Sequence, residues 1–160
     1  MPQHDDEAGE RLARAALRTR RSIAVAESLT GGALSARLAR LSDASEWYRG
    51  AVVAYASEVK HDVLAVPPGP VVSQTAARAM ADGVASLLGA DVTISVTGVG
   101  GPAPQDGAPQ GTVWMALHDH DETAARCFRF DGSAADVVRD TCDAALEWLL
   151  ECVAGAESRR

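Results

Sequence analysis

The stretch Ala26-Glu27-Ser28-Leu29-Thr30-Gly31-Gly32 decides how this chain folds and where its chemistry can lie. An apolar run over residues 22–27 predicts a buried strand, and the pattern over about 31–41 predicts a helix. A turn between them puts a hydroxyl beside the free N–H groups and positive end of a helix, which suit a nucleophile, a phosphate or a developing oxyanion. The same residues also fit a plain turn, in which Gly supplies a positive φ and Thr caps the helix.

The rest of the sequence predicts a regular alternation of helices and strands. It indicates helices over 7–20, 73–89 and 133–153, a short helix capped by Ser57, and strands over 50–55, 92–96, 112–117 and 124–130. A short polar turn at 119–121 joins the last two strands, which makes them antiparallel. This order predicts an α/β fold: a three-layer α/β/α domain with a mixed sheet of about five strands.

Length and composition favour a single globular domain. The chain has 160 residues, 47% of them hydrophobic, and residues 1–6 and 154–160 are expected to be frayed ends. The N-terminus is too acidic and polar for a signal peptide and no apolar run approaches membrane-spanning length, so we expect a cytoplasmic protein with no membrane partner. The net charge of −7 and the lack of a Lys/Arg stripe argue against nucleic acid as a partner.

The cysteines and histidines lack the spacing of a metal site, so no metal and no cofactor is expected. Cys127, Cys142 and Cys152 are predicted to be small buried apolar residues. Cys142 and Cys152 lie in one predicted helix, about 15 Å apart, which is too far for a disulfide. His118 and His120 flank a turn, which is typical of an exposed polar loop.

Three segments with polar or glycine residues follow predicted strands, at 27–32, 55–60 and 97–102. If these strands are parallel, all three segments lie at their carboxyl ends, where open α/β sheets bind ligands. The third segment, Thr97-Gly98-Val99-Gly100-Gly101-Pro102, allows a ligand to approach the backbone closely, although it also fits an ordinary flexible loop. The convergence of the three segments is stronger evidence for a site than any one of them.

Ser28 and Lys60 together suggest a serine nucleophile with a lysine base, and Tyr55 could relay a proton or orient the substrate. A lysine can serve as a base when burial or neighbouring positive charge lowers its pKa. Taken singly, however, a lysine at this position is more typical of a solvated surface charge, and Tyr55 is typical of a half-buried strand end.

The residues that suggest this chemistry also match the motifs of a known family. The chain resembles the CinA C-terminal domain family, whose active members are nicotinamide-mononucleotide deamidases. The resemblance runs from about residue 7 to 153. The matching blocks are Ala26-Glu27-Ser28-x-Thr30-Gly31-Gly32, Gly50-x-Val52-x-x-Tyr55-x-x-Glu58-x-Lys60, Val72-Ser73, Thr97-Gly98-x-x-Gly101-Pro102 and Gly111-Thr112-Val113.

The resemblance implies an amidohydrolase of pyridine-nucleotide salvage that converts nicotinamide mononucleotide to nicotinate mononucleotide and ammonia. The family's catalytic serine, tyrosine and lysine fall on Ser28, Tyr55 and Lys60. A small mononucleotide is the expected partner, and a homo-oligomer is expected. The residues expected to bind the substrate are Glu27, Thr30, Gly31, Gly32, Glu58, Thr97, Gly98, Gly100, Gly101 and Pro102. Whether the N–H groups at 30–32 hold the oxyanion or the phosphate stays open, and the two glutamates could face the pyridinium ring or orient Lys60.

The chain departs from the family pattern at two places. Leu29 stands where the family commonly has Cys, and Pro67-Pro68-Gly69-Pro70 replaces a longer loop and could reshape one wall of the pocket. Many members also carry an N-terminal pyrophosphatase-like domain, which these 160 residues lack. Two other functions fit the sequence: a non-catalytic nucleotide-binding module that acts with a competence or DNA-damage-related partner, and a Ser/Lys amidase for another amide.

Overall fold

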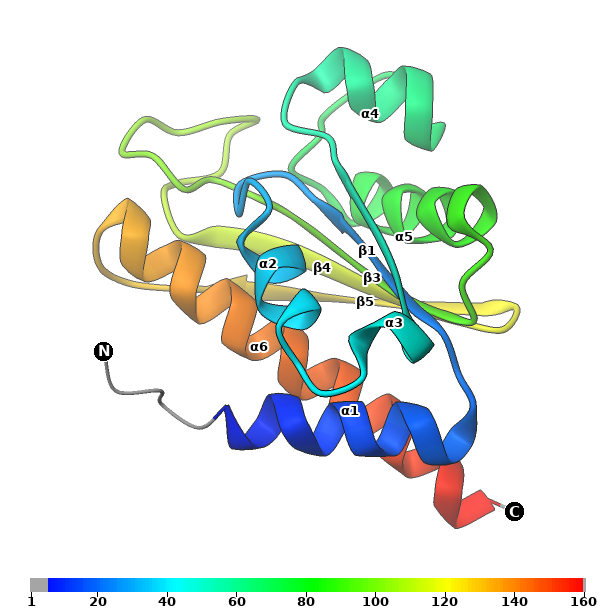
Figure 1. The fold of residues 1–160 in the computed structure, drawn as a ribbon. Helices are drawn as coiled ribbons and strands as arrows, with labels where there is room; N and C mark the ends of the chain where they lie inside the picture. Colours follow the sequence, from blue (N-terminus) through cyan, green and yellow to red (C-terminus); the bar gives the residue numbers. More distant parts are fainter. Residues whose placement is uncertain (1–5, 160) are drawn as a thin grey trace.

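A computed structural model describes residues 6–159 of the chain (Figure 1). The elements are, in order, α1 (Glu7–Thr19), β1 (Ile23–Glu27), α2 (Ala33–Ala39), α3 (Ala44–Trp47), β2 (Tyr48–Val53), α4 (Ser57–Leu64), α5 (Gln74–Leu88), β3 (Val92–Gly98), β4 (Thr112–Asp119), β5 (Glu122–Arg129), α6 (Ala134–Gly155) and the 3₁₀-helix η1 (Ala156–Arg159). The predicted three-layer α/β/α fold with a mixed sheet is confirmed.

The sheet has five strands in the order β2-β1-β3-β4-β5. Strand β1 pairs in parallel with both β2 and β3, whereas β4 is antiparallel to β3 and to β5. All five residues of β1 are buried, because paired strands flank it and helices cover both of its faces. The carboxyl ends of β1, β2 and β3 therefore meet at one edge of the sheet.

Two layers of helices cover the sheet (Figure 1). Helices α1, α2 and α6 pack on one face, where alternate residues of β1, Ile23 and Val25, enter the main core. Helices α4 and α5 pack on the other face with the intervening Ala24 and Ala26. On that face Ser95 donates to the Ala77 carbonyl of α5 at 2.6 Å, and Thr93 of β3 makes the same kind of bond to Ala81, so α5 lies close to β3.

The sequence predicts a buried strand over 50–55, and β2 differs from this prediction in its bounds and its exposure. It begins and ends two residues earlier and is an edge strand, paired only with β1, so Val53 is 44% exposed. The short helix α3 before it was not predicted, because four residues carry no readable period. The predicted Ser57 cap was wrong: Ala56 holds the N-cap position of α4, without a side-chain hydrogen bond.

The ends of the described chain are more regular than predicted. Asp6 caps α1 by accepting from the Gly9 N–H, and helical structure continues from α6 through η1 to residue 159. Residues 1–5, also predicted to be frayed, lie outside the described part. The prediction for Cys127 was wrong: it is exposed, because β5 is the other edge strand, whereas Cys142 is buried and Cys152 partly buried, all with free thiols.

Helix α4, which carries Lys60, is held against α5 at a glycine. A Cβ built on Gly83 of α5 would lie 2.4 Å from the carbonyl oxygen of Leu64, the last residue of α4. A real Cβ cannot approach a backbone oxygen so closely, so only glycine lets the two helices pack at this distance. The position of Lys60 over the sheet edge therefore depends on Gly83.

We predict that Gly83→Ala lowers the free energy of unfolding by about 1–3 kcal/mol, because α4 must move away from α5. Gly155→Ala is the matched control: Gly155 is also helical, a Cβ there would have no neighbour within 4 Å, and alanine favours the helix. Urea denaturation followed by circular dichroism measures both variants. Equal stability of Gly83→Ala and wild type would contradict the role of this contact.

Candidate active site

A cleft of about 400 Å³ opens at the carboxyl ends of the three parallel strands. The turn after β1, helix α4 and the long β3–β4 loop form its walls, and Figure 1 shows that loop extending beyond this edge of the sheet. The residues that line it are Ser28, Leu29, Tyr55, Lys60, Val71, Val72, Thr97, Gly98, Val99, Gly100, Gly101, Pro102, Ala103, Gln105, Ala134 and Val138. The predicted convergence of segments 27–32, 55–60 and 97–102 is thus present in the structure.

Ser28 lies at the first position after β1 and is held by its backbone on two sides. Its N–H donates to the Val96 carbonyl of β3 at 3.1 Å, and its carbonyl accepts from the Gly31 N–H at 3.0 Å. Gly31 and Gly32 have φ values of +57° and +104°, which glycine adopts without strain. The turn therefore holds Ser28 at the wall of the cleft, where the residue is 8% exposed.

Glu27 is fully buried beneath this turn and caps helix α2. One carboxylate oxygen accepts from the Thr30 hydroxyl at 2.6 Å and from the Leu34 N–H at 3.0 Å, and the other accepts from the Ser35 N–H at 2.8 Å. These donors include N–H groups of the first turn of α2, so the helix end is already occupied by a negative charge. Glu27 and Thr30 support the turn from below.

Lys60, the only lysine of the chain, is 2% exposed and lines the cleft. Its ammonium donates to the Tyr55 carbonyl at 3.1 Å. Burial lowers the pKa of Lys60 below its ordinary value, and the negative charge of Asp106 offsets part of this effect. Lys60 is therefore not the solvated surface charge that a lone lysine usually is. Its neutral form becomes populated at a lower pH than that of an exposed lysine.

Tyr55 lies at the rim of the cleft and is 71% exposed. Its contact with Lys60 is made by its backbone carbonyl. Tyr55 lies two residues after the end of the edge strand β2, and its exposure differs from the half-buried strand end considered above. Tyr55 thus contacts Lys60 through its main chain.

The β3–β4 loop is anchored at its base. The Val99 N–H donates to the Thr112 carbonyl at 2.9 Å, and the Gly111 N–H donates to the Val99 carbonyl at 2.8 Å. A Cβ on Gly98 would lie 2.6 Å from the Thr112 carbonyl oxygen, so Gly98 serves the close pairing of β3 with β4. Gly101, in contrast, has no neighbour that a Cβ would meet within 4 Å, which leaves its backbone open at the cleft.

Asp106, in the same loop, was missed by the sequence analysis. Its carboxylate accepts from the Val71 N–H at 2.9 Å and the Val72 N–H at 3.0 Å, and its φ is +50°. The dipeptide Asp106-Gly107 is a turn signal and aspartate tolerates this backbone conformation, so the turn was readable from the sequence. The partners lie 34 and 35 residues away, and no local pattern reveals them.

The structure brings most of the predicted site residues together. Ser28, Tyr55, Lys60, Thr97, Gly98, Gly100, Gly101 and Pro102 line the cleft. Glu27, Thr30, Gly31, Gly32 and Glu58 are not among the residues that line it. The first four of these build the turn that carries Ser28, and Glu58 is exposed on α4.

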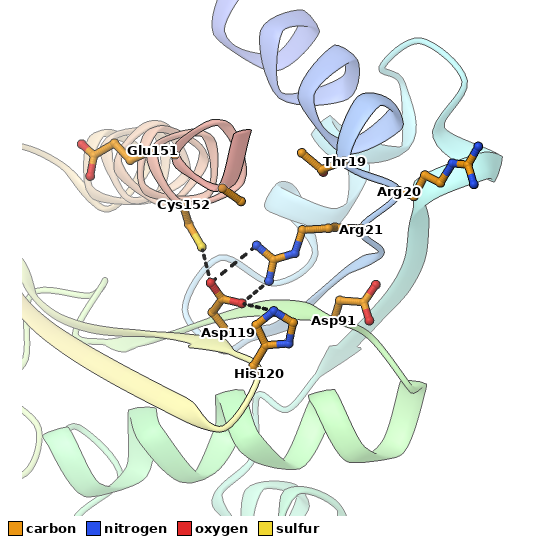
Figure 2. Close-up of a pocket in the computed structure, with 10 residues that line it drawn as sticks. Thr19, Arg20, Arg21, Asp91, Asp119, His120, Glu151 and Cys152 are labelled. Atoms are coloured by element: carbon orange, nitrogen blue, oxygen red, sulfur yellow. Dashed lines mark hydrogen bonds and ion pairs between the residues drawn. The ribbon is translucent and has the colours of Figure 1, made fainter. Parts of the chain in front are cut away.

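A second cleft of about 450 Å³ lies at the opposite end of the parallel strands, where β1 and β3 begin (Figure 2). There the buried Arg21 forms an ion pair with Asp119, which also accepts from the Cys152 thiol at 3.3 Å. Burial raises the pKa of Cys152 to about 11, so this thiol stays protonated near neutral pH. Through the ion pair and the thiol contact of Asp119, this cleft joins α6 to the sheet.

Comparison with known proteins identifies the family. The chain matches the CinA C-terminal domain over residues 5–153 and belongs to this family, which confirms the resemblance. It is 40% identical over 139 residues to a CinA-like protein from Frankia casuarinae. This match covers 84% of this chain and 32% of that protein. A CinA-like protein from Geobacter sp. is 37% identical over 153 residues, 90% of this chain and 36% of that protein. The chain thus spans about a third of the length of these relatives.

Solved structures of the family share the fold over nearly the whole chain. A CinA superfamily protein from Klebsiella pneumoniae matches with a TM-score of 0.89 and 34% identity, covering 93% of this chain and 97% of that one. A competence or damage-inducible protein from Enterobacter asburiae matches with a TM-score of 0.89 and 31% identity, covering 92% and 96%. The α/β architecture described here is therefore the architecture of the superfamily.

Two kinds of feature are absent from residues 6–159, the part of the chain that the structure describes. No helix in this part of the chain has both the length and the apolar character needed to cross a membrane. Within the same residues, no three His, Cys, Asp or Glu side chains form a group that could hold a metal ion.

We predict that Glu27→Gln lowers the free energy of unfolding by about 1–3 kcal/mol, because either orientation of the amide turns its NH₂ toward a buried donor. Glu46→Gln, on the exposed first turn of α3, is the matched control and should leave the free energy of unfolding unchanged. Urea denaturation measures the effect, and a Glu27→Gln protein as stable as wild type would refute the capping role.

Proposed function

We propose that the chain hydrolyses the carboxamide of nicotinamide mononucleotide to nicotinate mononucleotide and ammonia, with Ser28 as nucleophile and Lys60 as base. The observation that carries the proposal is that the one lysine of the chain is buried in the same cleft as Ser28. Burial of a lysine without a direct ion pair is costly, and it is useful where a neutral amine is needed. Family membership supports the same reaction.

In the first step, the Ser28 oxygen attacks the amide carbon and its proton moves to the Lys60 nitrogen. A tetrahedral intermediate with a negatively charged oxygen forms. Lys60 then returns the proton to the amide nitrogen, the C–N bond breaks, and ammonia leaves. The product of this half-reaction is an ester between the nicotinate carbonyl and Ser28.

In the second step, water replaces the serine. Lys60, neutral again, accepts a proton from the water as its oxygen attacks the ester carbon. Collapse of the second intermediate breaks the bond to the Ser28 oxygen, which takes the proton back from Lys60. The nicotinate group leaves as the carboxylic acid, which loses its proton to water or to ammonia, and both side chains return to their starting forms.

Two sets of backbone N–H groups fit the negative charges of this reaction. The carboxylate of Glu27 already accepts from Leu34 and Ser35, which argues against α2 as the phosphate site. The open backbone at Gly101 suits the phosphate instead, since glycine allows close approach. The N–H of Leu29, directly after the nucleophile and at the cleft wall, suits the oxyanion.

Two alternatives are tested by the same assay. Relatives of known structure are described as competence or damage-inducible proteins, which is compatible with a nucleotide-binding module that acts with a separate partner. Such a module would bind the mononucleotide without releasing ammonia. An amidase for another substrate would release ammonia from other amides in a substrate panel and leave nicotinamide mononucleotide intact.

We predict that Ser28→Ala lowers ammonia release from nicotinamide mononucleotide by at least about a thousandfold, because no other group supplies the attacking oxygen. The fold should be unchanged, since the turn is held by backbone bonds and by Glu27. Ser45→Ala, at an exposed position of α3, is the control and should be as active as wild type. A folded Ser28→Ala protein that is fully active would remove Ser28 from this role.

We also predict that Lys60→Arg is nearly as inactive as Lys60→Ala, because arginine keeps the charge and cannot give up its proton. In the wild type, kcat/KM should rise with pH through the pKa of Lys60, since the neutral amine is the working form. That midpoint should lie below the ordinary lysine value of about 10.4, because burial lowers the pKa. An active Lys60→Arg variant would make Lys60 an electrostatic contact and exclude it as the base.

A further inference from the structure

The β3–β4 loop carries two consecutive glycines, Gly100 and Gly101, at the wall of the cleft. Glycine populates a wide range of φ and ψ, so the peptide between two glycines turns freely unless a contact holds it. The preceding residue, Val99, is fixed by hydrogen bonds of both its N–H and its carbonyl. Among the residues that the structure describes, residues 100–104 take part in a single hydrogen bond, in which the Gln110 side-chain amide donates to the Gly100 carbonyl at 3.0 Å.

Gln110 makes this bond from a rigid base. It occupies the second position of a β-turn that is closed by the Thr112 N–H, which donates to the Pro109 carbonyl at 3.2 Å. Gly111, at the third position, has the positive φ that a type II turn requires, +88°. Its N–H donates to the Val99 carbonyl at 2.8 Å. The backbone that carries the Gln110 side chain therefore has little freedom, and the bond to the loop fixes the side chain itself.

The bond from Gln110 sets the direction of the Gly101 N–H. The peptide bond between Gly100 and Gly101 is trans, so the carbonyl of the first and the N–H of the second point in opposite directions. Both glycines line the cleft, whereas Gln110 is not among the residues that line it. The carbonyl that Gln110 holds therefore points away from the cleft, and the N–H of Gly101 points toward it.

Space for a ligand remains in front of this N–H. A Cβ on Gly101 would meet no atom within 4 Å, and the residue is exposed. One residue earlier, a Cβ on Gly100 would lie 3.8 Å from the Cβ of Leu29, so this part of the loop packs against the residue that follows Ser28. Lys60 is the only charged side chain among the residues that line the cleft, so an anion bound there depends on backbone N–H donors.

We propose that Gln110 is a positioning residue, which holds the peptide between Gly100 and Gly101 so that the Gly101 N–H donates to the phosphate of the mononucleotide. This inference deepens the proposed function and rests on it for the identity of the ligand. A hydrogen bond to a phosphate is stronger from an N–H that already faces it than from a peptide that must first be turned, because the fold has already met the cost of ordering. Gln110 acts on the ligand only through this peptide.

Two substitutions remove the bond and leave the turn intact, since backbone bonds hold the turn. Gln110→Met has a side chain of similar length and flexibility that cannot donate a hydrogen bond. Gln110→Asn keeps the amide but is one methylene shorter, so it does not reach the Gly100 carbonyl. Gln74→Met is the matched control, because Gln74 is exposed at the first position of α5.

Titration calorimetry with nicotinate mononucleotide and with nicotinate riboside, which lacks the phosphate, separates the phosphate contact from the rest of the cleft. We expect Gln110→Met and Gln110→Asn to raise the Kd of the mononucleotide about tenfold and to leave that of the riboside unchanged, because a hydrogen bond to a charged group is weakened. A loop that is merely loosened would weaken both ligands alike. An equal loss for both ligands, no loss for either, or a wild type that binds the two equally would overturn the proposal.

Deamidation kinetics provide the second readout. Gln110→Met should raise the KM for nicotinamide mononucleotide about tenfold and keep kcat within about twofold, since the phosphate contact is the same in the ground state and the transition state. Gln74→Met should match the wild type. A fall in kcat with KM and Kd unchanged would assign the Gly101 N–H to the oxyanion and refute its place at the phosphate. A loss of affinity for the mononucleotide alone, in a protein that releases no ammonia, would reject the deamidase function while the role of Gln110 stands.

Discussion

The buried carboxylate of Glu27 is the interaction on which the rest of the site depends. It ends the central strand β1, accepts from the first turn of α2 and binds the hydroxyl of Thr30. One side chain thereby fixes the strand, the turn and the helix relative to one another. Because a buried carboxylate must have all its bonds satisfied, the turn has little freedom, and Ser28 is held where β1 and β3 end.

The other half of the site depends on close packing. Helix α4 can lie against α5 only because Gly83 has no side chain, and this contact brings Lys60 under the rim of the cleft. Around the lysine are the Tyr55 carbonyl, the segment at Val71 and Val72, and the β3–β4 loop. A buried amine with one carbonyl contact and a remote carboxylate is an environment that favours the neutral form and still tolerates the charged one.

Much of this arrangement could be predicted from sequence because it follows from local rules. The change from an apolar run to Ser, Thr and Gly identified the turn at Ser28, and Ser73 and Gly89 marked the ends of α5. The short turn at 119–121 required an antiparallel pair, and the parallel β1, β2 and β3 then brought three segments to one edge.

Several features that escaped prediction depend on partners outside the local sequence. A lone lysine in a helix is usually an exposed surface charge. The burial of Lys60 follows from the contact of α4 with α5, which the local sequence does not reveal. Glu27 was expected to face a substrate, yet its partners are the N–H groups seven and eight residues ahead, in a helix whose start had to be known first. Asp106 and Val71 meet across 35 residues, and the exposure of Cys127 follows from strand order.

The central claim is that Ser28 attacks the amide with the help of Lys60, and the ester on Ser28 is its direct consequence. The measurement is acid quenching of the protein within the first turnover of nicotinamide mononucleotide, followed by mass spectrometry of the peptide that contains Ser28. The account predicts a nicotinate mononucleotide adduct on Ser28 that forms as ammonia is released and disappears when substrate is exhausted. A burst of ammonia with an unmodified Ser28 peptide, or an adduct on another residue, would contradict it.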